Sequence, residues 1–148
     1  QNREVPELNY ERVYQLKKDF PHLEIIINGG ITTLEQSSEH LKHLDGVMIG
    51  REAYTNPYLL ASVDQFIYGS DKPLKTREKV AEEFLKYVDN ELSKGTKLNA
   101  MTRHILGLFH GMPGARQYRR HISENAHKPS ATIEVLKTAL EKTSGVNG

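Results

Sequence analysis

The chain of 148 residues contains no cysteine and no tryptophan. The lack of cysteine excludes disulfides, thiolate metal ligands and a cysteine acting as nucleophile or acid within these residues. It also fits a cytoplasmic protein, which is the location that we expect. The seven histidines are scattered, with no His-x-x-x-His pair and no carboxylate cluster at ligand spacing, so the sequence predicts no metal site.

Long apolar runs are absent as well. The longest uninterrupted apolar stretches are only a few residues, as at 25–27, whereas a membrane-spanning helix needs about 20. No charged and then apolar leader opens the chain, so the sequence predicts neither a membrane partner nor secretion. Hydrophobic residues make up 37% and charged residues 26% of the chain, which is a globular composition and not a disordered one.

Acidic residues are missing from one stretch of the second half. Residues 1–75 hold 8 Lys and Arg against 11 Asp and Glu, a net charge of −3, whereas residues 76–148 hold 12 against 8, a net charge of +4. No acidic residue lies between Glu91 and Glu124, although that stretch contains six Lys and Arg. A local positive field of this kind suits a polyanion, and the alternative is a solvated helical face.

The first half contains a repeating pattern of helices and strands. Residues 10–19 have the apolar spacing of a helix, and residues 23–28 and 46–49 contain short β-branched runs. Strands that alternate with helices at this spacing indicate βα units and a parallel sheet. Two strands cannot close a sheet, so the segment is predicted to be the C-terminal part of an eight-stranded TIM (β/α)8 barrel.

Two further helices are predicted in this segment. The first begins at Thr32 or Thr33, with Glu35 three residues after Thr32 to complete a capping box. The second begins near Asn56 and Pro57, which are typical of a helix N-cap and of a first helical turn. Each of these helices follows a strand and a glycine-containing turn.

A polar stretch at residues 69–73 is predicted to link two domains, residues 1–68 and residues 74–148. Beyond the linker the apolar spacing is helical throughout, which indicates a helical bundle. The helices are expected at 77–94, 100–111, 115–126 and 131–143. The predicted fold class is therefore α/β, with the last βα units of a TIM barrel followed by an all-α helical domain.

Each of the two strands is followed by a glycine-containing turn. Asn28-Gly29-Gly30 follows the first strand, and Gly50-Arg51 follows the second. Glycine lets the backbone approach a phosphate closely, the next helix offers its positive end, and the arginine can add a charge-assisted hydrogen bond. The last two strands of a TIM barrel often end in such a site. The pattern therefore predicts a phosphate site, against the alternative of two ordinary turns.

Three arginines stand close together in the second half. Arg116, Arg119 and Arg120 occupy positions i, i+3 and i+4, so one helix face presents three guanidinium groups. The stretch that contains them is free of acids, and an RNA backbone would neutralise them. The alternative is that the arginines pair with acids of the same fold, such as Glu82 or Glu124.

These motifs resemble those of one enzyme family. Residues 27–31 (Ile-Asn-Gly-Gly-Ile), residues 45–54 (Asp-Gly-Val-Met-Ile-Gly-Arg-Glu-Ala-Tyr) and Asn56-Pro57 are similar to the end of the barrel of tRNA-dihydrouridine synthases. Residues 114–120 (Gly-Ala-Arg-Gln-Tyr-Arg-Arg) resemble the helical domain of the same family. The Asn-Gly-Gly and Gly-Arg-Glu-Ala-Tyr forms are similar to its A subfamily. The resemblance covers essentially the whole chain.

The resemblance implies an activity, cofactors and site residues. The full-length enzyme would reduce D-loop uridines of tRNA to 5,6-dihydrouridine as a monomer, with FMN as cofactor and NADPH as reductant. The residues expected to bind the FMN phosphate are Asn28, Gly29, Gly30, Gly50 and Arg51. The residues expected to bind tRNA are Arg3, Arg116, Arg119 and Arg120. The catalytic cysteine of the family is absent here, so no catalytic residue is assigned and the chain alone is expected to be inactive.

Two other interpretations are open. The chain could be a non-catalytic RNA-binding helical module, although two phosphate turns would then have no role. It could also come from another FMN-dependent TIM-barrel oxidoreductase, such as a dihydroorotate dehydrogenase, although the arginine helix would then be unexplained.

Overall fold

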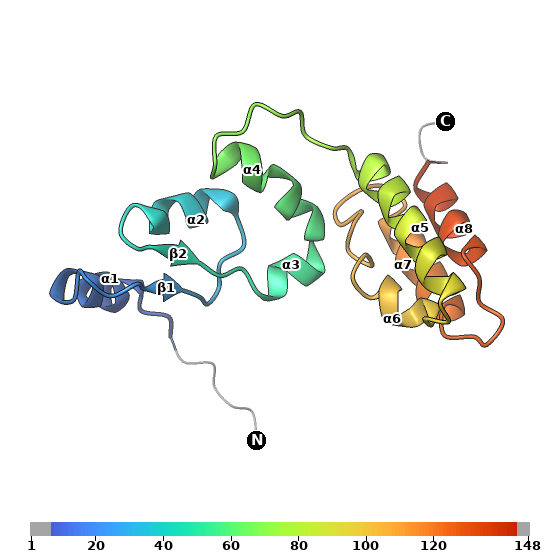
Figure 1. Cartoon of the computed structure of the whole chain (residues 1–148), viewed down its shortest axis with the longest axis horizontal. Helices are drawn as coiled ribbons and strands as arrows, with labels where there is room; N and C mark the ends of the chain where they lie inside the picture. The colour runs from blue at the N-terminus through green and yellow to red at the C-terminus, as the bar shows by residue number, and fades with distance from the viewer. Residues whose placement is uncertain (1–6, 145–148) are drawn as a thin grey trace, which may run out of the picture. The chain divides into compact units, whose positions relative to one another are not determined.

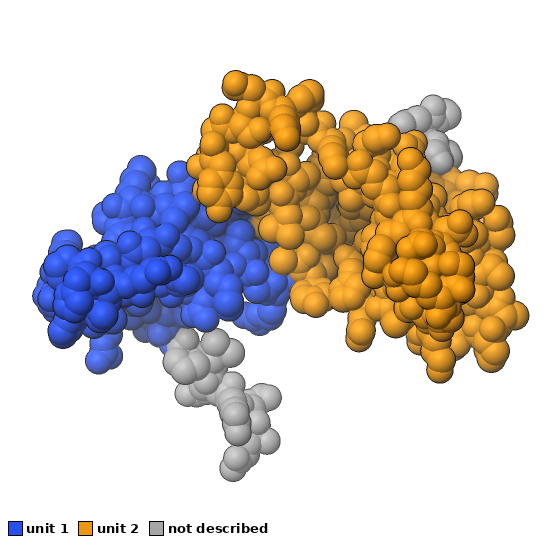
Figure 2. Space-filling view, viewed as in Figure 1, with its two compact units in different colours: residues 1–52 blue, residues 53–148 orange. Residues whose placement is uncertain are grey.

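The computed structural model describes residues 7–144 of the chain. The chain divides into two compact units, Gln1–Glu52 and Ala53–Gly148, called unit 1 and unit 2 below (Figure 2). None of the helices within the described range is long and apolar enough to span a membrane.

Unit 1 contains two helices and a two-stranded parallel sheet (Figure 1). Its elements in chain order are α1 (Tyr10–Asp19), β1 (Ile26–Ile27), α2 (Leu34–Leu41) and β2 (Gly46–Val47). The strands are adjacent, with Ile26 opposite Gly46 and Ile27 opposite Val47. The predicted order of helix, strand, helix and strand is confirmed. The strands are shorter than the apolar runs that predicted them, because each has a single neighbouring strand in the described chain.

The core of unit 1 forms where both helices pack on this sheet. Ile27, Ile31 and Leu44 are buried there. Asp45, which directly precedes β2, holds α1 against both strands. Its carboxylate lies 2.7 Å from the Lys17 ammonium and accepts the Ile25 backbone N–H at 2.8 Å. These two hydrogen bonds lower the pKa of Asp45, the bond from the lysine more than the other.

Helix α2 begins one residue later than the predicted capping box requires. Thr33 is the N-cap: its hydroxyl accepts the Gln36 N–H at 3.1 Å, and the Gln36 side chain accepts the Thr33 N–H at 3.3 Å. The predicted box between Thr32 and Glu35 is therefore wrong. Glutamine also completes capping boxes, and here its side-chain oxygen also accepts the Thr32 N–H at 2.9 Å.

Unit 2 is helical. After α3 (Arg51–Thr55), which crosses the division between the units, its elements are the 3-10 helix η1 (Pro57–Ser62), α4 (Val63–Phe66), α5 (Arg77–Ser93), α6 (Leu98–Thr102), α7 (Ala115–Asn125) and α8 (Glu134–Ser144). No strand occurs between residue 76 and the last described residue, as predicted. Its largest fully buried side chains are Tyr118, Leu108, Ile122, Leu136 and Val88.

The helix predicted over 100–111 is largely absent. Only α6 is helical there, and residues 103–112 form successive turns, with N–H groups bonded to the carbonyl three residues earlier, as from Leu108 to Ile105. Two distant contacts explain the difference. The buried Tyr118 hydroxyl donates to the Ile105 carbonyl at 2.9 Å. A Cβ on Gly107 would lie 2.1 Å from the Thr55 carbonyl oxygen, so a backbone segment crosses at this glycine.

Residues that precede the predicted linker pack with the helices that follow it. The Tyr58 hydroxyl donates to the Lys75 carbonyl at 2.6 Å, and the Arg77 guanidinium lies 4.1 Å from the Tyr58 ring centre. The Arg77 side chain also donates to the Leu108 carbonyl at 3.0 Å. This packing places residues 53–68 in unit 2. The boundary at residues 69–73 stays a prediction.

Helix η1 begins where a helix was predicted, with Pro57 in its first turn. Asn56 takes the N-cap position, but its side chain makes no capping hydrogen bond. Its Oδ1 atom is buried and accepts no hydrogen bond from the described residues.

Candidate functional site

The two glycine-containing turns leave the same edge of the sheet. Because β1 and β2 are parallel neighbours, residues 28–30 and residues 50–51 both follow the carboxyl ends of the strands. A hydrogen bond from the Met48 N–H to the Ile27 carbonyl, at 2.8 Å, continues the pairing up to this edge. Asn28, Gly30, Gly50 and Arg51 are exposed there. The fold therefore brings the predicted phosphate-binding residues to one edge of unit 1.

The backbone of the first turn requires glycine. Gly29 has a φ of 101° and Gly30 a φ of 65°, and both values lie in the left-handed region that other residues enter at a cost. A Cβ on Gly30 would also lie 2.7 Å from a methyl carbon of Leu8. A Cβ on Gly50 would meet nothing within 4 Å, so the second turn is open to an approaching group.

The N–H groups of these turns are available to a ligand. Those of Gly29, Gly30 and Gly50 donate no hydrogen bond to the part of the chain that the structure describes. Adjacent free N–H groups on a turn with positive φ form a concave site for anions. Arg51 stands next to Gly50 and begins α3. The arrangement can therefore bind a phosphate through backbone N–H groups, with a guanidinium group beside them.

Tyr10 of α1 fixes the orientation of the first turn. Its hydroxyl donates to the Gly29 carbonyl at 2.6 Å. That carbonyl and the Gly30 N–H belong to one planar trans peptide and point in opposite directions. Tyr10 therefore holds the Gly30 N–H away from itself. The sequence analysis missed this residue, because the apolar spacing of α1 assigns Tyr10 only to its packing face.

The buried side chain of His40 packs against Tyr10. The His40 ring on α2 meets the Tyr10 ring edge-on, with 4.6 Å between the ring centres. Its Nδ1 atom lies 2.5 Å from the Tyr14 hydroxyl. Burial lowers the pKa of His40, and the nearby His43 lowers it further. The imidazole is therefore neutral at pH 7, and it adds no positive charge behind the turn.

Helix α7 presents its arginines to solvent. Tyr118 and Ile122 are buried on one side of the helix, as predicted, so Arg116, Arg119 and Arg120 are exposed on the other side. Close packing holds the start of this helix against the end of α8. A Cβ on Gly114 would lie 2.4 Å from the Lys142 carbonyl oxygen, and the glycine has a φ of 79°.

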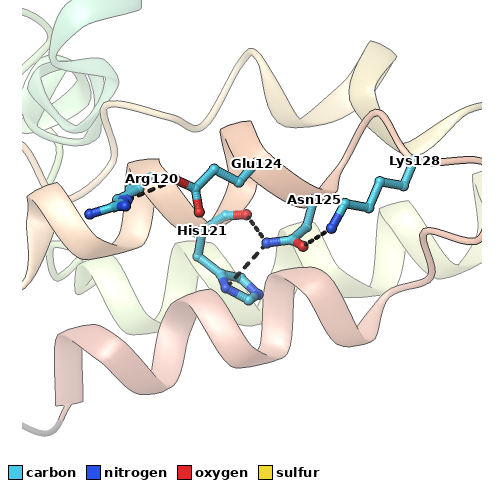
Figure 3. Close-up of polar contacts among 5 residues, drawn as sticks. All are labelled: Arg120, His121, Glu124, Asn125 and Lys128. Atoms are coloured by element: carbon cyan, nitrogen blue, oxygen red, sulfur yellow. Dashed lines mark hydrogen bonds and ion pairs between the residues drawn. The ribbon is translucent and has the colours of Figure 1, made fainter.

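The three arginines differ in their partners. The Arg120 Nε atom lies 2.7 Å from a carboxylate oxygen of Glu124, one helical turn away (Figure 3). This hydrogen bond lowers the pKa of Glu124 and raises that of Arg120. The side chains of Arg116 and Arg119 form neither an ion pair nor a hydrogen bond with any described residue. The alternative of pairing within the fold therefore holds for Arg120 but for neither of the other two.

Two other assignments concern residues outside these clusters. Arg3 lies outside the described residues. Within the described range, no group of three or more His, Asp or Glu side chains is placed to hold a metal ion.

Comparison with known proteins identifies the family. The family described as dihydrouridine synthase (Dus) matches residues 1–144. The chain is 63% identical to the tRNA-dihydrouridine(20/20a) synthase of Vibrio vulnificus (strain CMCP6), over 96% of this chain and 44% of that protein. It is 60% identical to the protein of the same name from Shewanella oneidensis, over 95% of this chain and 42% of that protein. The chain thus spans less than half the length of these curated relatives, and it belongs to the dihydrouridine synthase family.

Proposed function

We propose that this chain is the C-terminal part of an enzyme that reduces D-loop uridines of tRNA to 5,6-dihydrouridine. The observation that carries the proposal is the pair of glycine turns at one sheet edge, in a chain more than 60% identical to a protein named for this activity. FMN is proposed as the cofactor and NADPH as the reductant. The enzyme is expected to act as a monomer in the cytoplasm.

The described residues fit the phosphate of FMN. Three N–H groups, from Gly29, Gly30 and Gly50, lie in the turns that follow the two strands and donate no hydrogen bond to described residues, and Arg51 can balance part of the phosphate charge. Glycine at position 30 allows the positive φ of this turn and its close packing on Leu8. Asn28 adds an exposed amide beside the turn. Bound FMN would supply the hydride for the uracil double bond, and the residues named here would hold and orient it.

The surface of unit 1 supports a place in a larger barrel. Ile26 is 60% exposed and Met48 is 51% exposed, although both lie in or directly after the strands. Apolar side chains at the strands of a parallel sheet are normally covered on both faces. Further strands and helices of a TIM barrel would cover them. In this proposal residues 1–68 end the barrel and residues 74–148 form the helical tRNA-binding domain.

The exposed side of α7 is proposed to bind the tRNA backbone. Arg116 and Arg119 are the main contacts, because no described acid neutralises them. Arg120 contributes less while Glu124 holds it, and Arg3 is proposed as a further contact. This chain supplies no catalytic acid, since the proposed cysteine would lie in the part of the enzyme that precedes these residues.

Two substitutions in the full-length enzyme separate the two binding roles. Gly30→Asp brings a Cβ to 2.7 Å from a Leu8 methyl carbon at a φ of 65°, so it should distort the first turn, and apo-enzyme titrated with FMN should bind it more weakly. Replacing Arg116 and Arg119 by Ala should leave FMN affinity unchanged. It should also flatten the plot of log K for tRNA against log salt by up to about 2. Dihydrouridine formed in a tRNA transcript, detected by mass spectrometry, tests the activity itself. Unchanged FMN binding by Gly30→Asp would contradict the phosphate assignment.

A further inference from the structure

Unit 2 contains a cleft of about 480 Å³ between the turn that follows α5 and the turn that follows α7. Leu98 and Ala126, both buried, are among the apolar residues that line it. Lys97, His127 and Lys128 also line it, and all three are exposed. The α5–α7 cleft therefore combines apolar lining with the ammonium groups of Lys97 and Lys128.

The cationic groups of the cleft are not neutralised by neighbouring acids. No Asp or Glu is among the described residues that line it. Glu91, near the end of α5, is bound by the Lys94 ammonium at 3.4 Å and by the Thr96 hydroxyl at 3.0 Å. Glu124 is bound by Arg120. The nearest acids along the chain on either side of the cleft therefore already have partners.

The two lysines differ in how firmly they are held. The Lys128 ammonium donates to the Asn125 side-chain oxygen at 2.8 Å, and the Asn125 amide donates to the His121 carbonyl at 2.8 Å (Figure 3). This chain of neutral acceptors positions the Lys128 charge without cancelling it. Lys97 forms no hydrogen bond or ion pair through its side chain with the described residues, and it is free to follow a ligand.

The cleft continues the arginine side of α7. At about 100° per residue, position 127 returns to within about 20° of position 116 around the helix axis, about 16 Å further along it. Helix α7 ends at Asn125, but Ala126 keeps right-handed helical backbone angles (φ −67°, ψ −23°) and its N–H bonds to the Ile122 carbonyl, so the helical path extends to His127. Arg116 and His127 therefore lie on the same side of this helical path, near its two ends.

We propose that the α5–α7 cleft binds a single nucleotide of the RNA strand that lies along the arginine side of α7. The inference rests on the RNA binding proposed above. The apolar lining suits the face of an unstacked base, and Lys97 and Lys128 suit the phosphate of the same nucleotide. A contact made by charge alone would not require the apolar lining.

The test uses the full-length enzyme and an unmodified tRNA transcript, with affinity measured over a range of salt concentrations. The double variant Lys97→Ala and Lys128→Ala should flatten the log K against log salt plot by about 1, because one phosphate contact is lost. Ala131→Phe fills the cleft without a change of charge. It should weaken binding about fivefold or more, with the salt slope unchanged. The matched control replaces Lys79 and Lys137, two exposed lysines outside the cleft, by Ala and should bind normally.

The outcomes separate this inference from the proposal on which it rests. If the variant lacking Arg116 and Arg119 binds weakly while both cleft variants bind normally, the cleft has no role and RNA binding stands. If all three bind normally, both proposals fail. If only the lysine variant changes, the cleft holds a phosphate alone and the single-nucleotide inference is wrong. Thermal unfolding checks that Ala131→Phe folds, and Ala131→Leu, a smaller apolar substitution at the same position, replaces it in the comparison if it does not.

Discussion

Glu124 is predicted to restrain the RNA binding that is proposed above for α7. Its carboxylate lies 2.7 Å from the Arg120 Nε atom, so one of the three guanidinium groups of α7 is already paired in the free protein. The hydrogen bond from Arg120 lowers the pKa of Glu124, so the carboxylate is charged throughout the neutral range. RNA that approaches Arg120 must therefore compete with this carboxylate and is repelled by it. Glu124→Gln removes the negative charge and keeps the size of the side chain.

The expected magnitude follows from counterion release. Each phosphate that a cation neutralises contributes about 0.7 to 0.9 to the slope of log K against log salt. Freeing Arg120 should therefore steepen the slope by up to about 0.9 and tighten binding, most clearly at low salt. Both side chains are largely exposed, so the loss of their ion pair should change the stability of the fold very little.

The assay compares four forms of the full-length enzyme in tRNA titrations at several salt concentrations. They are the natural protein, Glu124→Gln, Arg120→Ala, and the variant with both changes. Glu124→Gln should bind more tightly than the natural protein, and the double variant should lose this gain because the freed arginine is absent. Glu134→Gln on α8, which breaks an exposed pair with Lys137, is the matched control. Equal slopes for the natural protein and Glu124→Gln would refute the reasoning and place Arg120 outside the RNA contact.

Three further predictions follow from single contacts. Tyr10→Phe removes the hydrogen bond to the Gly29 carbonyl. FMN binding should then weaken about two- to tenfold in a fluorescence titration, as expected for the loss of a hydrogen bond of about 0.5–1.5 kcal/mol. Unchanged affinity would show that the turn keeps its conformation without Tyr10. Tyr118→Phe leaves the Ile105 carbonyl without its buried donor and should lower the free energy of unfolding by about 1–3 kcal/mol in denaturant titrations, whereas a loss below this range would mean that water replaces the hydroxyl. Burial lowers the pKa of His40 below its unfolded value of about 6.5, so the unfolded state binds the extra proton and the free energy of unfolding should fall as pH drops through about 6.5. His40→Gln should reduce the dependence of the free energy of unfolding on pH in denaturant titrations. An unchanged dependence would assign it to other groups.

The features that the sequence predicted correctly depend on neighbours along the chain. The ends of α1 and the start of α7 are set by local apolar spacing and by the glycine turn before α7. The two glycine-containing turns could be predicted because glycines directly follow short β-branched runs, and their role as a phosphate site stays a prediction. The pair between Arg120 and Glu124 was equally local, at i and i+4 on one helix, and it was named only as an alternative.

The features that the sequence did not predict depend on contacts between distant residues. The shortness of α6 follows from the hydrogen bond between Tyr118 and the Ile105 carbonyl and from the backbone segment that crosses at Gly107. Neither contact can be predicted from the apolar spacing of residues 100–111. The bond from Tyr10 to the Gly29 carbonyl joins residues 19 positions apart. Such contacts are decided by packing in three dimensions, which a pattern of residue types does not specify.

The close approach of Gly107 to the Thr55 backbone limits how the helical part of this protein can be cut out or exchanged. A fragment that starts at the polar stretch of residues 69–73 would lose the segment that packs on Gly107, together with the Tyr58 ring beside Arg77. Chimaeras that join the helices of one relative to the barrel of another at that stretch would pair Gly107 with a foreign partner segment. A junction upstream of Thr55 would keep both sides of this contact from one parent.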